Sequence, residues 1–156
     1  MKRIENKDAF TLIELVVTML IVGLLASIAV PASTNLYTNA QISATGKEMK
    51  NIQLAIMGDA QQGLMGFRDH IGDLPANLTE LFDNTVAAYP GFNNYTQRGW
   101  NGPYIEDRDS DGDGRAEVLD DAWGNPYVYV QAAGTLTSWG PDQAAGGGDD
   151  IVLNID

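Results

Sequence analysis

A run of carboxylates between residues 107 and 121 has the residue types and the spacing of a calcium-binding loop. Counted from Asp109, aspartates occupy loop positions one, three, five and twelve, and a glycine occupies position six. Calcium takes about six to eight oxygen ligands, alternate side chains of such a loop point inward, and the glycine permits its sharp turn. The spacing therefore predicts a Ca²⁺ site formed by Asp109, Asp111, Asp113, the backbone carbonyl of Arg115, and Asp120.

The residues around this loop do not predict a complete helix–loop–helix. Ala116 stands where a larger aliphatic residue is usual, and the sequence Trp-Gly-Asn-Pro at 123–126 indicates a turn instead of a second helix. Asp120 is also shorter than the bidentate Glu that usually closes such a loop. We therefore expect an isolated calcium loop of weak, extracellular-type affinity, and a solvated acidic surface loop is the alternative interpretation.

The rest of the composition excludes several classes of function. The chain has no Cys, which excludes disulfides, thiolate metal sites and a Cys nucleophile. His70 is the single histidine, and no nucleophile–base pair or phosphate loop accompanies it, so we expect that the chain is not an enzyme. The formal charge of −12 argues against direct binding of nucleic acid, which requires a basic surface.

The N-terminal segment predicts a membrane anchor with its N-terminus in the cytoplasm. Residues 1–9 are polar and basic, and residues 10–32 form an apolar run that is long enough to span a bilayer and longer than the apolar core of a secretory signal peptide. Glu14 is the only charge in this run, and a carboxylate in hydrocarbon costs about 2.5–3.5 kcal/mol. An anchor that polymerises explains Glu14 better than a plain anchor does, because packed subunits can supply a positive partner.

The sequence Ala-Phe-Thr-Leu-Ile-Glu-Leu-Val-Val at residues 9–17 resembles the N-terminal motif of type IV pilins and type II secretion pseudopilins. The resemblance implies that a prepilin peptidase/N-methyltransferase cuts between Ala9 and Phe10 and methylates the new amine of Phe10. It also implies that Glu14 pairs with the N-terminal amine of a neighbouring subunit during assembly. Ala9 departs from the family, which usually has Gly before the cut.

The remaining pattern predicts an α+β fold in which a long N-terminal helix carries a small antiparallel sheet and calcium-binding loops. Apolar residues at helical spacing, including Met49, Ile52 and Ile56, predict one helix from about Phe10 to Gly66 or Ile71, with Pro31 as the point where it would bend. A short helix ending at Phe82 and three strands near residues 123–130, 136–139 and 151–155 follow. We therefore expect a leader at 1–9, a transmembrane and polymerisation helix at 10–33, and a head at 34–156.

Two stretches near the C-terminus, Trp-Gly-Asn-Pro-Tyr at 123–127 and Ser-Trp-Gly-Pro-Asp at 138–142 with its glycine-rich continuation, resemble the major type II secretion pseudopilin. That family lacks the disulfide of many type IV pilins and binds Ca²⁺ in the loop between its last strands. The resemblance implies that Asp142, Asp149 and Asp150 are calcium ligands. A glycine-rich turn with incidental acidic residues is the alternative interpretation.

These features together predict a structural filament subunit and not an enzyme. We expect a homopolymer formed through the N-terminal helix, anchored in the inner membrane before assembly, with its head in the periplasm. The resemblance implies further partners: other pilins or pseudopilins and an inner-membrane assembly platform. A pseudopilus for protein export is the leading hypothesis, and a type IV pilin or minor pilin acting in adhesion, motility or DNA uptake is the alternative.

Overall fold

The computed structural model describes residues 10–107 and 116–155, and for residues 28–34 it describes the backbone without the side chains. The chain divides into two compact units, Met1–Asn39 and Ala40–Asp156. Helix α1 (Leu12–Met57) contributes residues to both units and is continuous through Pro31. The predicted long N-terminal helix is thus confirmed, although it ends earlier than expected.

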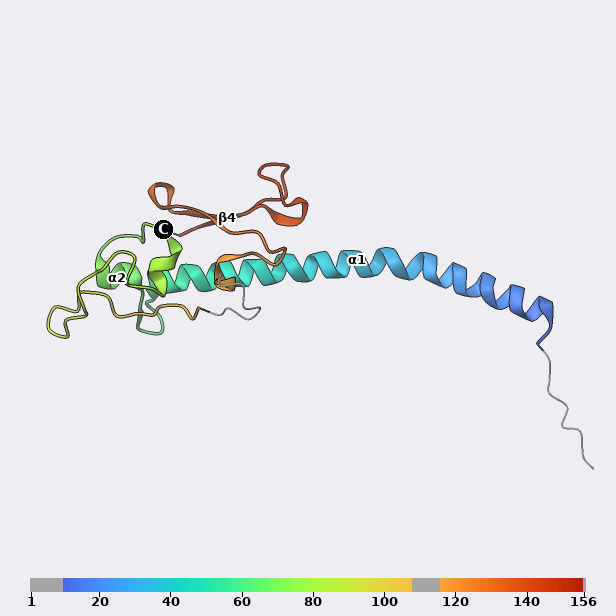
Figure 1. Cartoon of the computed structure of the whole chain (residues 1–156), viewed down its shortest axis with the longest axis horizontal. Helices are drawn as coiled ribbons and strands as arrows, with labels where there is room; N and C mark the ends of the chain where they lie inside the picture. The colour runs from blue at the N-terminus through green and yellow to red at the C-terminus, as the bar shows by residue number, and fades with distance from the viewer. Residues whose placement is uncertain (1–9, 108–115, 156) are drawn as a thin grey trace, which may run out of the picture. The chain divides into compact units, whose positions relative to one another are not determined.

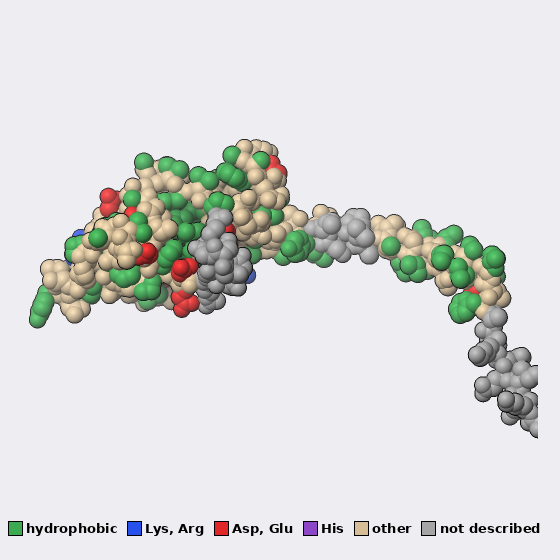
Figure 2. Space-filling view, in the orientation of Figure 1, with side chains coloured by type: hydrophobic (Ala, Val, Ile, Leu, Met, Phe, Trp, Pro, Cys, Tyr) green, Lys and Arg blue, Asp and Glu red, His purple; other side chains and the backbone are tan. Residues whose placement is uncertain are grey.

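The stretch of α1 up to residue 27, in the first unit, carries apolar side chains on all sides of the helix. Every side chain from residue 11 to residue 27 is exposed, and Figure 2 shows hydrophobic side chains covering this segment. Exposed apolar surface of this extent marks a site of interaction.

Across the described residues, no helix combines the length and hydropathy that crossing a membrane requires. The predicted span at 10–33 includes residues 28–33, whose side chains lie outside the described part of the structure.

The second unit adds two small antiparallel sheets and short helices to the end of α1. Strands β1 (Gly58–Asp59) and β2 (Leu64–Met65) form a two-stranded ribbon, and β3 (Val128–Val130), β4 (Thr135–Ser138) and β5 (Ile151–Asn154) form a sheet in the order β3-β4-β5. The helical pieces are α2 (Phe67–Ile71) and the 3₁₀ turns η1 (Leu78–Leu81), η2 (Glu117–Leu119), η3 (Gln131–Ala133) and η4 (Gly140–Asp142). Figure 1 shows the three-stranded sheet, in orange to red, beside the part of α1 in the same unit.

The core of this unit lies between one face of α1 and the inner face of the sheet. Met49, Ile52 and Ile56 recur at the spacing of one helical face and are fully buried, as the apolar pattern predicts. They pack with buried residues of the later elements: Phe67, Leu78, Leu81, Tyr127, Leu136 and Ile155. Each such aliphatic or aromatic side chain contributes about 1.5–3 kcal/mol on burial, so this stripe holds the sheet on the helix.

The predicted end of α1 at Gly66 or Ile71 is wrong, because the helix stops at Met57. Gly58 follows with φ +75°, a conformation that a side chain disfavours, and turns the chain into β1. A Cβ on Gly66 would lie 2.2 Å from the Gly58 nitrogen, so the returning strand passes directly against the helix end. The apolar residues Phe67 and Ile71 belong to the separate helix α2, which packs on the same core.

The predicted short helix forms as η1, with Asn77 at its N-cap position and Phe82 at its C-cap. It is organised by the carboxylate of Glu80, which is only 3% exposed. This carboxylate accepts hydrogen bonds from the Ala76 N–H at 3.1 Å and the Tyr89 hydroxyl at 2.8 Å. The acidic residue of this turn is therefore a structural acceptor that ties the following loop to η1.

A second buried carboxylate, Asp121, joins the turn before β3 to the end of β4. One oxygen accepts the N–H groups of Trp123 at 3.0 Å and Asn125 at 2.9 Å, and the other accepts the Ser138 hydroxyl at 2.5 Å. The adjacent Ala122 N–H donates to Thr45 of α1 at 3.1 Å. This network fixes both the start and the end of the sheet against the helix.

Replacement of Asp121 by Ala should destabilise the head markedly. The change leaves two N–H groups and the buried Ser138 hydroxyl without their acceptor, at a cost of about 1–3 kcal/mol in the free energy of unfolding. Urea unfolding of a head fragment beginning at residue 35 measures this loss, and Asp107→Ala, at an exposed carboxylate, is the matched control. Equal stability of the two variants would show that the network around Asp121 contributes nothing.

Candidate functional site

The start of α1 holds the carboxylate that the sequence singles out. The Thr11 hydroxyl oxygen accepts the Glu14 N–H at 3.3 Å, and the same hydroxyl donates to the Glu14 carboxylate at 3.5 Å. Thr11 therefore caps the first turn, and Glu14 lies in that turn, where the positive end of the helix dipole favours an anion. Both side chains are exposed, so the Glu14 carboxylate is open to a cation from another chain.

Thr11 is a site residue that the sequence analysis missed. A Thr three residues before a Glu, followed by an apolar run, is the local signature of a capping box and could have found it. Of the two residues at the predicted cut, Phe10 is described and 74% exposed. Ala9 lies outside the described residues.

The predicted calcium loop that begins at Asp109 falls almost entirely outside the described residues, which include neither Asp109, Asp111, Asp113 nor Arg115. Asp120 is described, half-buried, and ends η2 with its N–H donating to the Glu117 carbonyl at 3.1 Å. The Asp109–Asp120 ligand set therefore stays a prediction.

The second predicted set, Asp142, Asp149 and Asp150, lies in one loop between β4 and β5. Each of the three carboxylates uses one oxygen to accept an N–H of the loop itself. Asp149 accepts from the Asp142 N–H at 3.0 Å, Asp142 from Ala144 at 2.9 Å, and Asp150 from Gly146 at 3.0 Å. The loop backbone thus folds around the three carboxylates, and in each carboxylate the second oxygen accepts none of these three hydrogen bonds.

The remaining oxygens of these carboxylates lie near Gly147 or in the protein interior. A Cβ on Gly147 would lie 2.7 Å from Asp142 Oδ2 and 3.1 Å from Asp149 Oδ1, so both oxygens flank this glycine. Asp150 Oδ1 is buried and has no hydrogen-bond donor among the described residues. No Lys or Arg occurs in the segment 139–150 that could neutralise the three charges.

This arrangement fits a hard cation that takes oxygen ligands. Two carboxylate oxygens flank one glycine, and a third, buried oxygen has no partner. Within the described ranges, no group of three acidic or histidine side chains is already close enough to hold a metal ion. A cation here would therefore take a carboxylate pair together with backbone carbonyls or water, which calcium accepts readily.

Ser138, at the end of β4, holds the loop in place through hydrogen bonds and is not among the oxygens that flank Gly147. Its hydroxyl donates to Asp121, and its oxygen accepts the Gly140 N–H at 3.1 Å. Gly140 has φ +71°, and a Cβ there would lie 2.3 Å from the Asp149 carbonyl oxygen. Ser138 and Gly140 therefore position the loop, and sequence spacing alone could not indicate this because the partner of Ser138 is 17 residues away.

His70 has the role of a packed core residue. It is 5% exposed, its Nδ1 lies 3.0 Å from the Tyr104 hydroxyl, and its ring and that of Phe92 form an edge-to-face pair with ring centres 5.0 Å apart. Burial raises the pKa of the Tyr104 hydroxyl further above its ordinary value.

Two family models match the chain and together cover most of it. Residues 6–30 match the prokaryotic N-terminal methylation motif, and residues 35–154 match type II secretion system (T2SS), protein G. The chain is also similar to the type IV major fimbrial protein FimA of Dichelobacter nodosus, with 34% identity over 90 residues. That alignment covers 54% of this chain and 58% of the relative, which is less than two thirds of its length. No solved structure matches the chain.

Gly147→Ala should destabilise the β4–β5 loop more than Gly148→Ala. Both glycines have positive φ, +88° and +96°, so both variants carry a backbone cost of about 1–2 kcal/mol. Only at Gly147 does the new Cβ meet the carboxylates, whereas nothing lies within 4 Å of a Cβ on Gly148. Thermal unfolding of the two head variants measures the difference, and equal melting temperatures would contradict the carboxylate geometry described above.

Proposed function

Because the chain belongs to the family of type II secretion system protein G, we propose that it is a pseudopilin that assembles into a periplasmic pseudopilus for protein export. The family is one of pilin-like filament subunits and not of enzymes. The observation that carries the proposal is the succession, in one chain, of a methylation motif at residues 6–30 and a protein G domain at residues 35–154. In this proposal the segment with the methylation motif is the element that polymerises, and the protein G domain is the head that the polymer displays.

In this proposal, the methylation motif directs processing and placement. A prepilin peptidase/N-methyltransferase removes residues 1–9 and methylates Phe10. Residues 10–33 anchor the subunit in the inner membrane with its N-terminus in the cytoplasm, and residues 34–156 form the periplasmic head. The exposed apolar surface of residues 12–27 supports a segment that is covered by lipid before assembly and by other pseudopilin helices afterwards.

Glu14 is the assembly residue in this proposal. Its carboxylate lies at the exposed start of α1, held by Thr11, where an approaching N-terminal amine can reach it. The ion pair between Glu14 and the amine would form within apolar surroundings, where removing one partner of a buried ion pair costs about 3–5 kcal/mol.

Glu14→Gln should therefore lower filament assembly at least tenfold while leaving the head folded. The amide keeps the size and the hydrogen bond of the carboxylate but removes the charge that attracts the amine. The measurement is the sheared filament fraction of cells that produce the full chain, with Asp107→Asn, at an exposed head carboxylate, as the control. Assembly of Glu14→Gln at the level of the unaltered chain would refute this role.

Mass spectrometry of the mature chain should show a methylated Phe10 at its N-terminus.

We further propose that Ca²⁺ binds in the β4–β5 loop through Asp142 and Asp149, with Asp150 supporting the site. The two oxygens beside Gly147 and the buried oxygen of Asp150 support this assignment. The spacing from Asp109 to Asp120 supports a second, independent calcium loop. Calcium at either place would offset the repulsion of clustered carboxylates and stabilise the folded head by mass action.

Calcium should raise the melting temperature of the head, and a chelator should reverse the change. At a calcium concentration about 100 times Kd the stabilisation is about 2.7 kcal/mol. Asp142→Asn should remove most of this effect if the β4–β5 loop binds the ion, and Asp111→Asn should remove it if the first loop does. Magnesium, which demands a tighter octahedral shell, is the control ion. A melting temperature that is the same with calcium and with chelator would refute both sites.

The alternative function is that of a type IV pilin or minor pilin, and the similarity to a type IV major fimbrial protein is the observation that favours it. Deletion of the gene distinguishes the two functions. Loss of a pseudopilin leaves exported proteins in the periplasm, whereas loss of a pilin removes surface filaments together with adhesion, motility or DNA uptake.

A further inference from the structure

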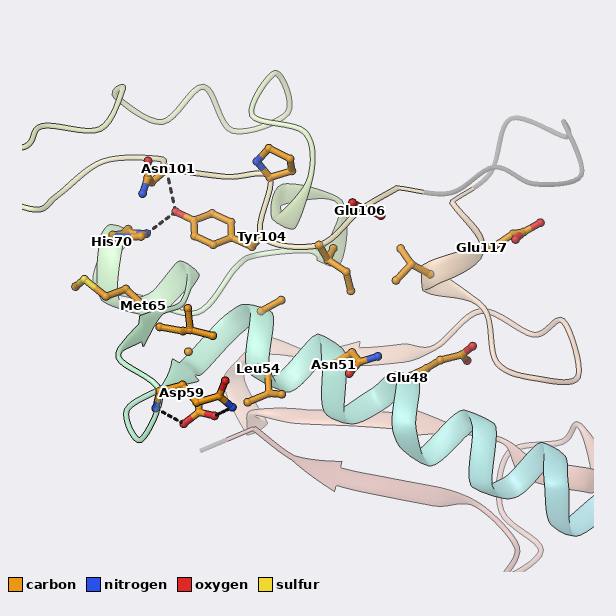
Figure 3. A pocket seen from close by; sticks show the side chains of 17 residues that line it. Glu48, Asn51, Leu54, Asp59, Met65, His70, Asn101, Tyr104, Glu106 and Glu117 are labelled. Carbon is orange, nitrogen blue, oxygen red and sulfur yellow. Dashed lines mark hydrogen bonds between the residues drawn. The ribbon is translucent and has the colours of Figure 1, made fainter.

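The segment from Trp100 to Tyr104 carries the single Asn-Gly pair of the sequence, Asn101 followed by Gly102. The Asn101 side chain is exposed, and it belongs to the lining of a pocket of about 810 Å³ beside α1. Figure 3 shows Asn101 at this pocket, with the Tyr104 hydroxyl between Asn101 and the ring of His70. Water therefore reaches the side-chain amide of Asn101.

The two groups of this pair that can react with each other are held by no hydrogen bond. Within the part of the chain that the structure describes, neither the Asn101 side-chain amide nor the Gly102 N–H has a hydrogen-bond partner. Only the backbone N–H of Asn101 is engaged, and it donates to the Tyr104 hydroxyl at 3.0 Å. Because Gly102 has no Cβ, nothing on that residue hinders the approach of its nitrogen to the side-chain carbonyl carbon of Asn101.

We propose that Asn101 is a site of spontaneous deamidation in the folded protein. The Gly102 nitrogen bonds to the side-chain carbonyl carbon of Asn101, the bond from that carbon to the amide nitrogen breaks, and ammonia leaves with the proton of the Gly102 N–H. The product is a cyclic succinimide. Water opens the ring at the side-chain carbonyl to give aspartate, or at the main-chain carbonyl to give isoaspartate. Water is the only co-reactant, and no group is oxidised or reduced.

The packing around Gly102 imposes glycine at this position. A Cβ there would lie 2.6 Å from Cζ2 of Trp100 and 2.8 Å from Cδ2 of Tyr104. Neither ring is free to move aside, since the Trp100 indole N–H donates to the Glu80 carbonyl at 3.1 Å and the Tyr104 hydroxyl lies 3.0 Å from Nδ1 of His70. A larger residue at this position would slow ring closure by steric hindrance, but the two rings exclude it. The fold itself therefore maintains the reactive pair.

Isoaspartate would strain this segment, because it adds one backbone atom between two fixed points. The Trp100 N–H donates to the Pro90 carbonyl at 2.8 Å, and the Tyr104 N–H donates to the Leu81 carbonyl at 2.7 Å. The added length displaces the Asn101 N–H from the Tyr104 hydroxyl and disturbs the edge-to-face pair of Trp100 and Tyr104, whose ring centres are 5.9 Å apart. Aspartate keeps the backbone length and adds only a carboxylate. Isoaspartate should therefore destabilise the head more than aspartate does.

Peptide mapping of the full chain, kept folded in mildly alkaline buffer for a long period, tests the proposal. Trypsin cleaves after Arg98 and Arg108, so the peptide 99–108 contains Asn101 as its one asparagine. This peptide should gain about 1 Da and separate into an aspartate and an isoaspartate form. The internal control is Asn94, which is also exposed but precedes a bulky tyrosine, and it should convert at least tenfold more slowly.

The same incubation of the denatured chain separates the effect of the fold from that of the sequence. Because the structure leaves both reacting groups of the pair unrestrained, the folded chain should convert Asn101 at a rate within tenfold of that in the denatured chain. A folded rate that is lower than this, or no higher than the rate at Asn94, would overturn the proposal. The measurement depends on no filament assembly, so its outcome is independent of the proposed function.

Asn101→Gln is the matched variant, because its longer side chain must close a larger ring. During incubation the melting temperature of the unaltered chain should fall as isoaspartate accumulates, whereas that of Asn101→Gln should stay constant. An equal fall in both would overturn the assignment of this damage to Asn101. Gly102→Ala should melt at a lower temperature even before incubation, because its Cβ meets the two rings. An unchanged melting temperature would show that the fold does not impose the glycine.

Discussion

The architecture of the head depends on the burial of one face of α1 against the sheet. Met49, Ile52 and Ile56 are removed from water in a core that they share with later elements, including Leu136 and Ile155. Polar contacts then set the register of that burial, since Thr45 and Gln41 of the same helix hold the N–H and carbonyl of Ala122. Once this helix face is occupied, the opposite face, which carries Lys47 and Lys50, stays exposed. A single amphipathic stripe thus decides which side of the helix builds the head and which side remains at its surface.

Carboxylates perform different tasks in this protein according to how many donors surround them. Asp121 is buried and accepts three hydrogen bonds, so it holds the turn before β3 to the end of β4. Asp142 and Asp149 accept backbone N–H groups with one oxygen each and direct the other toward Gly147, which suits a cation. Glu14 is exposed at a helix start with one local donor, and is available to an amine. Carboxylates therefore hold the fold together at Asp121, and at Asp142, Asp149 and Glu14 they leave oxygens open to the cation and the amine that we propose.

Sequence reasoning succeeded where the signal is local and periodic. It predicted the buried stripe of α1, the short turn ending at Phe82 and the three strands that became β3, β4 and β5. It also missed a local signal, because the spacing from Thr11 to Glu14 is that of a capping box. It placed the end of α1 too late, since Phe67 continues the apolar period although Gly58 has already turned the chain. Periodicity cannot distinguish one long helix from two helices that pack on the same core.

The sequence by itself determined the family and singled out Glu14 as the proposed assembly residue, because a charged side chain within an apolar run is recognisable without knowing any contact. It also indicated which acidic residues are candidates for calcium, because ligand spacing along a loop is a local property. Only the tertiary structure showed that Asp121 stabilises the sheet through a hydrogen bond. The spacing pattern had drawn attention instead to the aspartates of the predicted calcium loop, and the partner of Asp121, Ser138, comes close only through strand pairing. The close approach of Gly58 and Gly66, and the convergence of Asp142 and Asp149 on Gly147, were likewise decided there. Each depends on distances between atoms that are far apart along the chain or separated by a turn, and residue order does not specify such distances.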